Sequence, residues 1–405
     1  MRALMRSMAP TEFEDIAALV ALYRPGPMAA NMHNDYADRK NGRQDPAPFH
    51  PDASEILGGT YGLCIYQEEL MQLAQKFAGY DLAQADNLRK AMGKKIREKI
   101  QAERAGFVDG CEAQGYGREL GEELFDTMEP FADYAFNKSH SYGYGFVSYQ
   151  TAYLKANYPV EYLASLLTSV KSNLDKAGVY LNECRQLGIN VLVPDVNRSE
   201  VDFASIPDPE EGEYNAIPFG MSAVRNVGEA LVELIIEERT ENGPFESFID
   251  FCERVDYQVL NKRTLESLIK AGAFDSLGHK RKALLLAFEG IIDQTVASRR
   301  QHDMGVQTLF GAMDQDPAEP TFDDRPKIGS EAFDKSQRLS FEKEMLGLYV
   351  SDHPLMGIEA ALKRKAEDTI ADLDDLEEGQ MVAIGGVVTA LQKKWTRKGL
   401  SLIHI

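Results

Sequence analysis

The sequence contains few of the residues that build metal sites and disulfide frameworks. Four cysteines occur among 405 residues, at positions 64, 111, 184 and 252, without CxxC spacing or a histidine at metal-ligand distance. We therefore predict no metal site in this chain, and we interpret the cysteines as buried thiols of a cytoplasmic protein. Long apolar runs are also missing, and residues 1–8 lack the apolar core of a secretory signal, so no membrane partner is expected.

Basic residues are outnumbered by acidic residues. The chain carries 44 Lys and Arg against 64 Asp and Glu, a formal charge of -20, which argues against nucleic-acid binding through bulk charge. The charge is nevertheless segregated, because residues 86–104 hold seven bases and three acids whereas residues 105–133 hold eight acids and one base. A polyanion would therefore be bound by local basic patches on an acidic body.

Strand patterns are rare before residue 190, and helical periodicity dominates, so we predict a mainly α fold. A capping box at residues 11–14 opens a helix that runs to residue 22 and ends before Pro25. Apolar residues at three- and four-residue steps predict further helices over 66–77, 82–92, 96–113, 119–128, 148–157 and 160–169.

After these helices the pattern changes. Residues 190–194 predict a short strand, and residues 205–213, rich in Pro, Asp, Glu and Gly, predict a boundary loop. Further predicted segments are a helical unit over 223–277, a long helix over 279–300, a mobile linker over 301–340 and a helix over 339–348. Residues 379–391 predict the first strand of a barrel, and since one strand cannot close a barrel, we expect the chain to end inside a domain.

Residues 136–155 concentrate groups that suit a polyanionic ligand. They combine Lys138, Ser139 and His140 with several tyrosines in a predicted glycine-rich loop that leads into a helix. Such groups donate to phosphate oxygens and offer ring faces to a base or a sugar. A tyrosine-rich packed turn with an incidental histidine would give the same pattern.

A second basic segment carries Arg89, Lys90, Lys94 and Lys95 on one predicted helix. Lys90 and Lys94 are four residues apart, where like charges repel unless an anion lies between them. Asp86, four residues before Lys90, offers an ordinary ion pair instead, and a solvated basic face is an equally good interpretation. The segment is not a P-loop, because Lys95 replaces the Ser or Thr that this motif requires.

Residues 219–239 have the spacing of a helix, a tight hairpin and a second helix. In such a unit the amides at the start of the second helix bind a backbone phosphate without sequence preference. The predicted hairpin consists of Arg225, Asn226, Val227 and Gly228. Asn226 stands where glycine is usual, and asparagine tolerates left-handed geometry. Residues 248–273, with Lys262 and Arg263 at the turn, predict either a degenerate second copy or a plain helical hairpin.

Five motifs in collinear order resemble bacterial DNA polymerase III alpha subunits, the family C replicative polymerases. They are FEDIAALVALYRPGPM (13–28), TYGLCIYQEELMQLAQKFAGY (60–80), ADNLRKAMGKK (85–95), FNKSHSYGYGFVSYQTAYLKANYPVEY (136–162) and EKEMLGLYVSDHPL (342–355). The resemblance covers essentially the whole chain. It implies the end of the palm and a helical fingers domain in 1–205, a tandem helix-hairpin-helix and clamp-binding region in 206–312, a linker with a helix in 313–375, and the truncated start of an OB domain in 376–405.

The resemblance also implies roles for individual residues. Arg24, the cations of residues 89–95, and the Lys138, Ser139 and His140 loop match finger motifs whose cations face the triphosphate of a dNTP. The two hairpins would grip the backbone of primer-template DNA. Leu309 and Phe310 end a pentapeptide that resembles the family's sliding-clamp motif, although Val306 stands where the family has glutamine.

The family enzymes use Mg²⁺, whose aspartate ligands lie in palm sequence that would precede Met1, and we expect further holoenzyme subunits as partners. Met1 matches an internal methionine of the family, and residues 401–405 do not continue its pattern, so we expect a truncated or frame-shifted reading. We predict part of a replicative DNA-directed DNA polymerase that is inactive alone. The alternatives are a non-catalytic helix-hairpin-helix module that binds DNA and tethers the clamp, and a purely structural helical protein.

Overall fold

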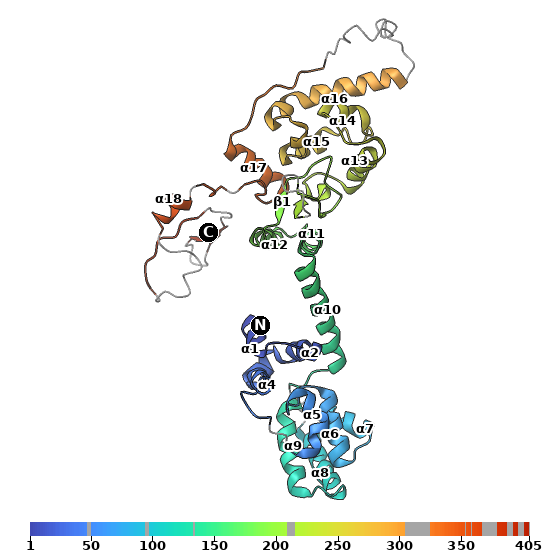
Figure 1. Cartoon of the computed structure of the whole chain (residues 1–405), viewed down its shortest axis with the longest axis vertical. Helices are drawn as coiled ribbons and strands as arrows, with labels where there is room; N and C mark the ends of the chain where they lie inside the picture. Colours follow the sequence, from blue (N-terminus) through green and yellow to red (C-terminus); the bar gives the residue numbers. More distant parts are fainter. Residues whose placement is uncertain are drawn as a thin grey trace. The chain divides into compact units, whose positions relative to one another are not determined.

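The computed structural model describes residues 1–46, 50–93, 97–132, 134–208, 215–303, 325–352, 354–357, 359–366, 379–386, 392–395 and 401–404. The chain divides into two compact units, Met1–Asn157 and Tyr158–Ile405 (Figure 1), and each is described by itself. Both are built mainly from helices, which confirms the predicted mainly α fold. None of the helices in the described ranges is long and apolar enough to cross a bilayer.

The first unit packs its helices around two hydrophobic clusters. Its helices are α1 (Arg2–Met8), α2 (Phe13–Leu22), α3 (Pro25–Ala29), α4 (Met32–Lys40), α5 (Ser54–Leu57), α6 (Gln67–Ala78), α7 (Leu82–Gly93), α8 (Arg97–Ala113), α9 (Arg118–Ala132) and α10 (Lys138–Asn157). One cluster lies among α6 to α9 and includes Phe77, Phe107 and Phe125, and the other joins α1, α2 and α4 around Leu22 and Tyr36. The helices predicted over 66–128 are confirmed, with ends that shift by a few residues.

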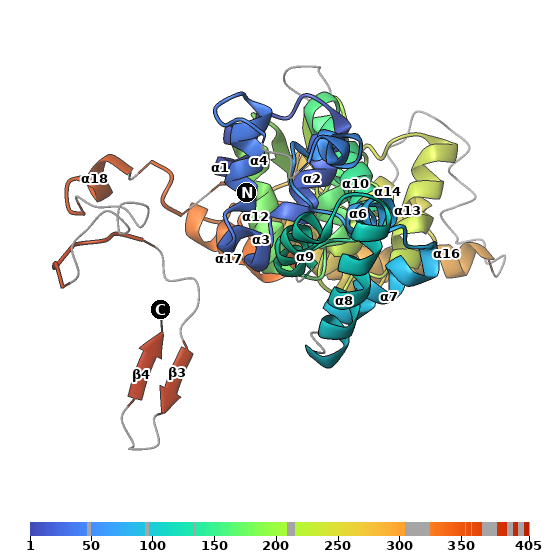
Figure 2. The same cartoon turned by 90° about the horizontal axis from the view of Figure 1, so that it is seen from below.

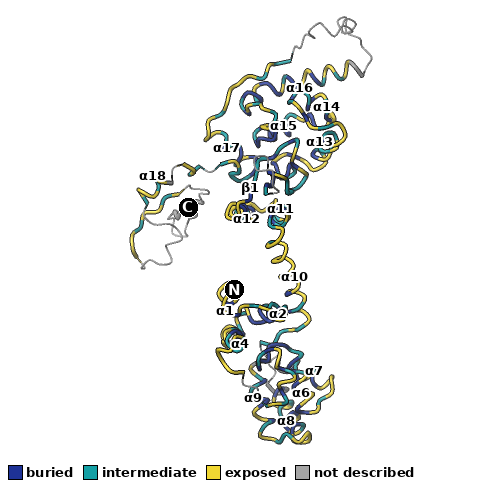
Figure 3. Tube along the Cα trace, viewed as in Figure 1, coloured by how far each residue is buried: buried dark blue, intermediate teal, exposed yellow. Residues whose placement is uncertain are grey.

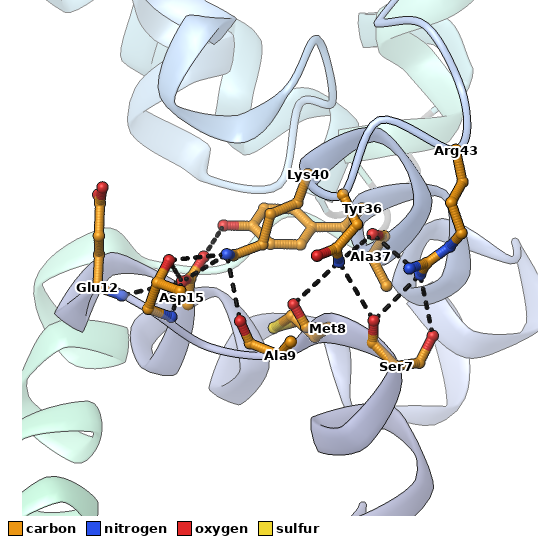
Figure 4. A network of polar contacts seen from close by, with 11 residues as sticks. Ser7, Met8, Ala9, Glu12, Asp15, Tyr36, Ala37, Lys40 and Arg43 are labelled. Carbon is orange, nitrogen blue, oxygen red and sulfur yellow. Dashed lines mark hydrogen bonds and ion pairs between the residues drawn. The ribbon is translucent and has the colours of Figure 1, made fainter.

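A buried ion pair fastens α4 to the start of α2 (Figure 4). Lys40 Nζ lies 3.3 Å from Asp15 Oδ2, and the two side chains are 7% and 4% exposed. The same oxygen accepts the backbone N–H groups of Thr11 at 2.8 Å and Glu12 at 3.1 Å, and Tyr36 Oη donates to the other oxygen at 3.3 Å. The predicted capping box is therefore wrong in register, because Asp15 closes the start of the helix.

The helix α10 begins at Lys138, whereas the pattern predicted a loop up to residue 147. Asn137 Oδ1 accepts the N–H of His140 at 2.8 Å, which satisfies a free amide of the first turn. Gly145 faces α2, where an added Cβ would lie 3.3 Å from Ala17 Cα. The glycines that predicted a loose loop thus allow two helices to approach closely. Residues 146–154 of α10 are all exposed (Figure 3).

The second unit combines helices with short strands. Its helices are α11 (Pro159–Ser169), α12 (Leu174–Gln186), α13 (Glu229–Asn242), α14 (Phe248–Arg254), α15 (Lys262–Ala271), α16 (Arg281–Asp303), α17 (Lys335–Leu346) and α18 (Glu359–Lys363). Its strands are β1 (Asn190–Leu192), β2 (Ala216–Pro218), β3 (Gln392–Trp395) and β4 (Ser401–His404). β1 pairs in parallel with β2, and β3 pairs antiparallel with β4 (Figure 2). The strand predicted at 190–194 and the long helix predicted at 279–300 are confirmed.

One hydrophobic core runs through the second unit from α11 to α17. It contains Leu163 and Leu181 together with Phe219, Phe251 and Leu346. Residues 158–205, which we grouped with the fingers domain, therefore pack in the same compact unit as the hairpins. The domain ranges themselves come from the family resemblance and stay a prediction.

Two expectations for the C-terminal third need correction. Residues 301–303 of the predicted mobile linker belong to α16. Residues 325–334 lie against the helical core, because Ala283 N–H donates to Glu331 O at 3.1 Å and Arg325 pairs with Glu253. The barrel strand predicted at 379–391 is not regular in its described part, 379–386, and the regular strands among the described residues after it are β3 and β4. An OB domain stays a prediction.

All four cysteines are free and buried, which confirms the interpretation as buried thiols. Burial raises the pKa of Cys64 well above the ordinary value of a thiol. It also raises the pKa of Cys111 and of Cys184 to about 11, and that of Cys252 to about 12.

Candidate nucleotide and nucleic-acid interface

The segment that precedes α10 joins the residues that begin α6. Phe136 forms a parallel bridge with Tyr66, and Lys138 donates its backbone N–H to Glu68 Oε2 at 2.8 Å. The ammonium of Lys138 lies 5.3 Å from the ring centre of Tyr66 and 5.9 Å from that of Tyr142. The first residue of α10 is therefore a half-buried cation held over two aromatic rings.

A buried carboxyl group lies close to this cation. Glu69 is 2% exposed, and its Oε2 accepts the N–H groups of Ile65 and Tyr66, both at 2.9 Å. Burial raises the pKa of Glu69 to about 7, although these backbone bonds and the charge of Lys138 act in the opposite direction. Near neutral pH the carboxyl group is therefore partly protonated, and it neutralises Lys138 only in part.

Arg24 holds the end of α2 against the same segment. Its Nη2 donates to Tyr134 O, its Cζ lies 4.4 Å from the ring centre of Phe136, and its Nε donates to Ala21 O at 2.8 Å. Burial lowers the pKa of the guanidinium. Arg24, which the family resemblance implies to face the triphosphate, is half-buried and engaged in these contacts.

Arg89 reaches the start of α6 from α7. Its Nη1 donates to Gln67 Oε1 at 3.2 Å, and its Nε and Nη2 donate to Asp86 Oδ1 at 2.9 and 2.8 Å. Lys90 Nζ lies 2.6 Å from Asp86 Oδ2. The hydrogen bonds from Lys90 and then from Arg89 lower the pKa of Asp86. The ion pair that the sequence left open is thus formed, and one carboxylate serves two cations.

Among the other predicted nucleotide-binding residues, the structure describes Ser139 and His140. Ser139 and His140 are exposed on the first turn of α10, and the His140 ring lies 5.4 Å from that of Phe136 and 4.6 Å from that of Tyr144. Lys94 and Lys95 lie outside the described residues.

The structure therefore brings two of the predicted cationic groups to one end of α6. Arg89 is bonded to Gln67, and Lys138 to the next residue, Glu68. Arg24 reaches the same place through Phe136. Three separate stretches of sequence thus place cationic side chains near the start of one helix.

The first hairpin has the predicted turn but lacks a full first helix. A single 3-10 turn, Met221–Ala223, precedes it. Asn226 adopts a φ of 64°, which confirms that asparagine replaces glycine at the left-handed position. The helix α13 begins after Gly228 without a side-chain cap, so its first amides keep donor capacity for an external anion. Arg225 is exposed, whereas Val227 is buried in the core.

In the second hairpin, other residues of the chain already bind the donors at the turn. The helices α14 and α15 form the predicted helical hairpin, but Asn261 Oδ1 accepts the N–H groups of Arg263 at 3.0 Å and Thr264 at 3.2 Å. Lys262 Nζ lies 2.9 Å from Asp293 Oδ2. The helix start is therefore capped from within the chain, and Lys262 is paired with an acid. Arg263 is exposed.

The two turns lie side by side. Asn226 Nδ2 donates to Ser267 Oγ at 3.1 Å, and Thr264 Oγ1 donates to Asn226 O at 3.3 Å. Arg225 and Arg263 stand on the two turns, are exposed, and form no ion pair with another residue of the described ranges. Two cations and one uncapped helix start thus share one surface of the second unit, which suits a phosphate backbone.

The last predicted site of this chain is the clamp-binding pentapeptide. Leu309 and Phe310, the proposed clamp contacts, lie outside the described residues. In the part of the chain that is described, no group of three or more His, Cys, Asp or Glu side chains could hold a metal ion. Those residues therefore do not fit a Mg²⁺ site, and we assign none of them as a ligand.

Comparison with known proteins identifies the family. A family model described as the bacterial DNA polymerase III alpha subunit finger domain matches residues 1–115, and one described as a helix-hairpin-helix motif matches residues 188–284. The DNA polymerase III subunit alpha of Mycobacterium tuberculosis is 48% identical over 408 residues, which cover 99% of this chain and 34% of that protein. The chain belongs to the DNA polymerase III alpha subunit family.

Alpha subunits of other bacteria are also similar to this chain. Those of Pseudomonas aeruginosa and Thermus aquaticus are 40% and 42% identical, over 98% of this chain and over 35% and 32% of those proteins. The chain thus spans about a third of the length of the curated relatives it matches. The predicted alpha subunit family, with its finger and helix-hairpin-helix regions, is confirmed.

Some residues that shape this alpha-subunit site were not foreseen. Tyr66, Gln67 and Glu68 hold Arg89 and Lys138. They lie in the motif at residues 60–80 and at the start of a predicted helix, but neither observation assigned them a part in the site. Their contacts join segments far apart in the sequence, which no local pattern reveals. Asp86 was foreseen because its partner Lys90 is four residues away on the same helix face.

Proposed function

We propose that this chain positions the incoming dNTP and grips primer-template DNA as part of a replicative DNA-directed DNA polymerase. The observation that supports this most is the gathering of Arg24, Arg89 and Lys138 at the start of α6, in the unit whose residues 1–115 match the finger domain. The chain has a formal charge of -20, and the acids Glu68, Glu69 and Asp86 lie beside these cations. A triphosphate at this helix start would therefore compete with those acids for the three cations.

In this proposal each finger residue neutralises or orients phosphate. Lys138 would donate from a position fixed by Tyr66 and Tyr142. Arg89 would donate through Nη1, which also contacts Gln67, because Asp86 occupies Nε and Nη2. Ser139 and His140 add donors on the exposed first turn of α10. Lys94 and Lys95, which lie outside the described residues, would add two further cations for the triphosphate. Such preorganised charge lowers the barrier of nucleotidyl transfer by stabilising charge that develops on the phosphates.

The second unit would hold the DNA backbone. The free amides after Gly228 and the exposed Arg225 and Arg263 would contact phosphates, while Asn226 and Val227 shape the turn. Lys262 would join only by leaving Asp293. Because such contacts ignore base identity, we expect binding without sequence preference.

The remaining parts of the proposal lie beyond the described residues. In the whole enzyme Mg²⁺ would activate the primer hydroxyl and stabilise the leaving pyrophosphate, with palm aspartates as ligands outside this chain. Leu309 and Phe310 would insert into an apolar pocket of the sliding clamp. Further holoenzyme subunits would complete the assembly. We expect the 405-residue chain alone not to extend a primer.

A salt titration with a labelled primer-template duplex tests the DNA-binding half. We expect log affinity to fall linearly with log salt, with a slope of about -5 for six phosphate contacts. Arg225→Glu should weaken binding and make the slope shallower by about one contact. Lys176→Glu, an exposed lysine of α12 in the same unit, is the matched control. A chain without salt-dependent affinity would instead be the purely structural helical protein.

Photocrosslinking with a dNTP analogue tests the nucleotide half. We expect crosslinks that require Lys138 and that survive Lys76→Met, a change of an exposed lysine of α6. Duplex binding without any crosslink to the finger cations would favour the alternative module that binds DNA and tethers the clamp. Robust primer extension by the purified chain with Mg²⁺ would refute the expectation that it is inactive alone.

A further inference from the structure

The motif at residues 342–355 has no part in the proposed function, yet it contains a fully buried carboxylate. Glu342, on α17, is 0% exposed. Taking a carboxylate out of water is costly unless a cation and hydrogen bonds replace the lost hydration. The partners of Glu342 therefore decide what this motif contributes.

Glu342 is the centre of a buried ionic network. Arg281 Nη1 lies 3.0 Å from Glu342 Oε1, and the Arg281 side chain is 8% exposed. Arg281 also pairs with Asp275, with Nη2 2.6 Å from Oδ2, and donates to Lys270 O at 3.2 Å. Ser351 donates through Oγ at 2.7 Å and through its backbone N–H at 3.1 Å to the two carboxylate oxygens. The network fastens α17 to the end of α15 and the start of α16.

The backbone leaves room for this network at one position. Gly272 follows α15 with a φ of 97°, and an added Cβ there would lie 2.2 Å from Arg281 Nη2. A side chain at this position would therefore meet the guanidinium, besides adopting a strained backbone. The absence of a side chain at Gly272 therefore leaves the space in which the guanidinium of Arg281 reaches Glu342.

The end of α17 in turn holds the first hairpin. Arg225 N–H donates to Met345 O at 2.9 Å, and Met345 is buried in the same core as Val224 and Val227. The opposite side of the turn is held by α15, through the bonds of Asn226. The turn that exposes Arg225 is therefore clamped between two helices, and Glu342 fixes one of them.

We propose that Glu342 is a positioning residue for DNA binding, which acts through Arg281 and α17 on the first hairpin. The ionic network sets where the Met345 carbonyl lies, and that carbonyl sets the backbone of Arg225 beside the amides of α13. The inference rests on the proposed function for its DNA readout. Its mechanical part, the bracing of the turn, concerns the free protein and is testable without DNA.

The decisive variant is Glu342→Gln, which keeps the shape of the side chain and removes its charge. Glu344→Gln, an exposed acid on the same helix, is the matched control. Hydrogen exchange in the wild-type chain and both variants reports on the amides of residues 224–228. We expect Glu342→Gln to speed exchange there by about tenfold, the effect of losing about 1.4 kcal/mol of local stability, and Glu344→Gln to leave it unchanged.

The same proteins are then titrated with a primer-template duplex at a temperature where all of them are folded. We expect Glu342→Gln to weaken binding about tenfold and to make the salt slope shallower by about 0.9, the loss of one phosphate contact. A purely structural role would lower the melting temperature and leave the affinity of the folded chain unchanged. Ser351→Ala, which keeps the ion pair, should give a smaller effect in the same direction and serves if Glu342→Gln does not fold.

The outcomes separate the two ideas. Faster exchange with weaker binding supports the positioning role. Unchanged exchange at residues 224–228 overturns it, as does unchanged affinity in a variant whose hairpin has loosened. A wild-type chain that binds no duplex refutes the proposed DNA contact, and with it the positioning role of Glu342 in DNA binding. The exchange result would then still show whether the ionic network stabilises the hairpin.

Discussion

Replacing Glu69 by glutamine should change how the stability of the first unit depends on pH. Glu69 is a buried carboxyl group at the start of α6, and burial raises its pKa from an ordinary value of 4.5 to about 7. Between these two values the folded chain keeps a proton that the unfolded chain has lost. The contribution of Glu69 to the free energy of unfolding is therefore highest below its ordinary pKa and falls as the pH rises to about 7.

The size of the effect follows from the two pKa values. A tenfold difference in proton affinity is worth about 1.4 kcal/mol, so the rise from 4.5 to about 7 corresponds to about 3 kcal/mol. Glutamine cannot ionise, but its amide oxygen still accepts the N–H groups of Ile65 and Tyr66. We therefore expect Glu69→Gln to gain about 2 kcal/mol relative to wild type between about pH 5 and about pH 8.

Urea denaturation followed by circular dichroism at a series of pH values measures this difference. Glu55→Gln, which neutralises an exposed acid of α5, is the control and should run parallel to wild type. If the curves of wild type and Glu69→Gln were also parallel over this range, Glu69 would titrate normally, and the reasoning about its burial would be refuted.

Three further changes have defined outcomes. Asn226→Ala places alanine at a φ of 64° and removes the bond to Ser267, so urea denaturation should show a loss of about 2 to 3 kcal/mol, whereas Asn226→Gly should lose about 1 kcal/mol. Asp15→Asn leaves the buried Lys40 unpaired and should cost about 3 to 5 kcal/mol in the same assay. Asp86→Asn releases the cations beside it and should tighten dNTP binding by up to about fivefold at low ionic strength, measured by equilibrium dialysis.

For each of these three changes, one result would contradict the expected mechanism. Equal stabilities for Asn226→Ala and Asn226→Gly would mean that the left-handed turn carries no strain for alanine. Recovery in the double variant Asp15→Asn with Lys40→Met is expected if the unpaired charge is the cause, and its absence would point to the lost cap of α2 instead. Weaker dNTP binding by Asp86→Asn would mean that the carboxylate orients the cations rather than competing for them.

Local features of this chain could be predicted because their causes are local. The helices α2 and α6 to α9 follow from capping residues and apolar spacing, and the turn at Asn226 follows from the backbone preference of one residue. The pairing of Asp86 with Lys90 follows from their spacing on one helix face. The family assignment rests on the order of five motifs, and it needed no structure.

Features with distant causes could not be predicted. Gly143 and Gly145 indicate flexibility when read alone, but Gly145 faces Ala17 of another helix, and α10 therefore starts well before the apolar pattern does. The bonds of Met345 to Arg225 and of Glu342 to Arg281 join residues far apart in the chain. An acid inside a helical motif gives no sign, by its sequence position, that it is fully buried.

The state of the four cysteines has a practical consequence for following the hairpins in solution. Maleimide dyes react with thiolates, and groups whose pKa lies near 11 or 12 and whose sulfur is buried remain almost entirely protonated and out of reach at neutral pH. A cysteine introduced by Arg263→Cys would therefore take up a fluorophore selectively. Spectroscopic reporters can be installed on this chain without first removing its native thiols.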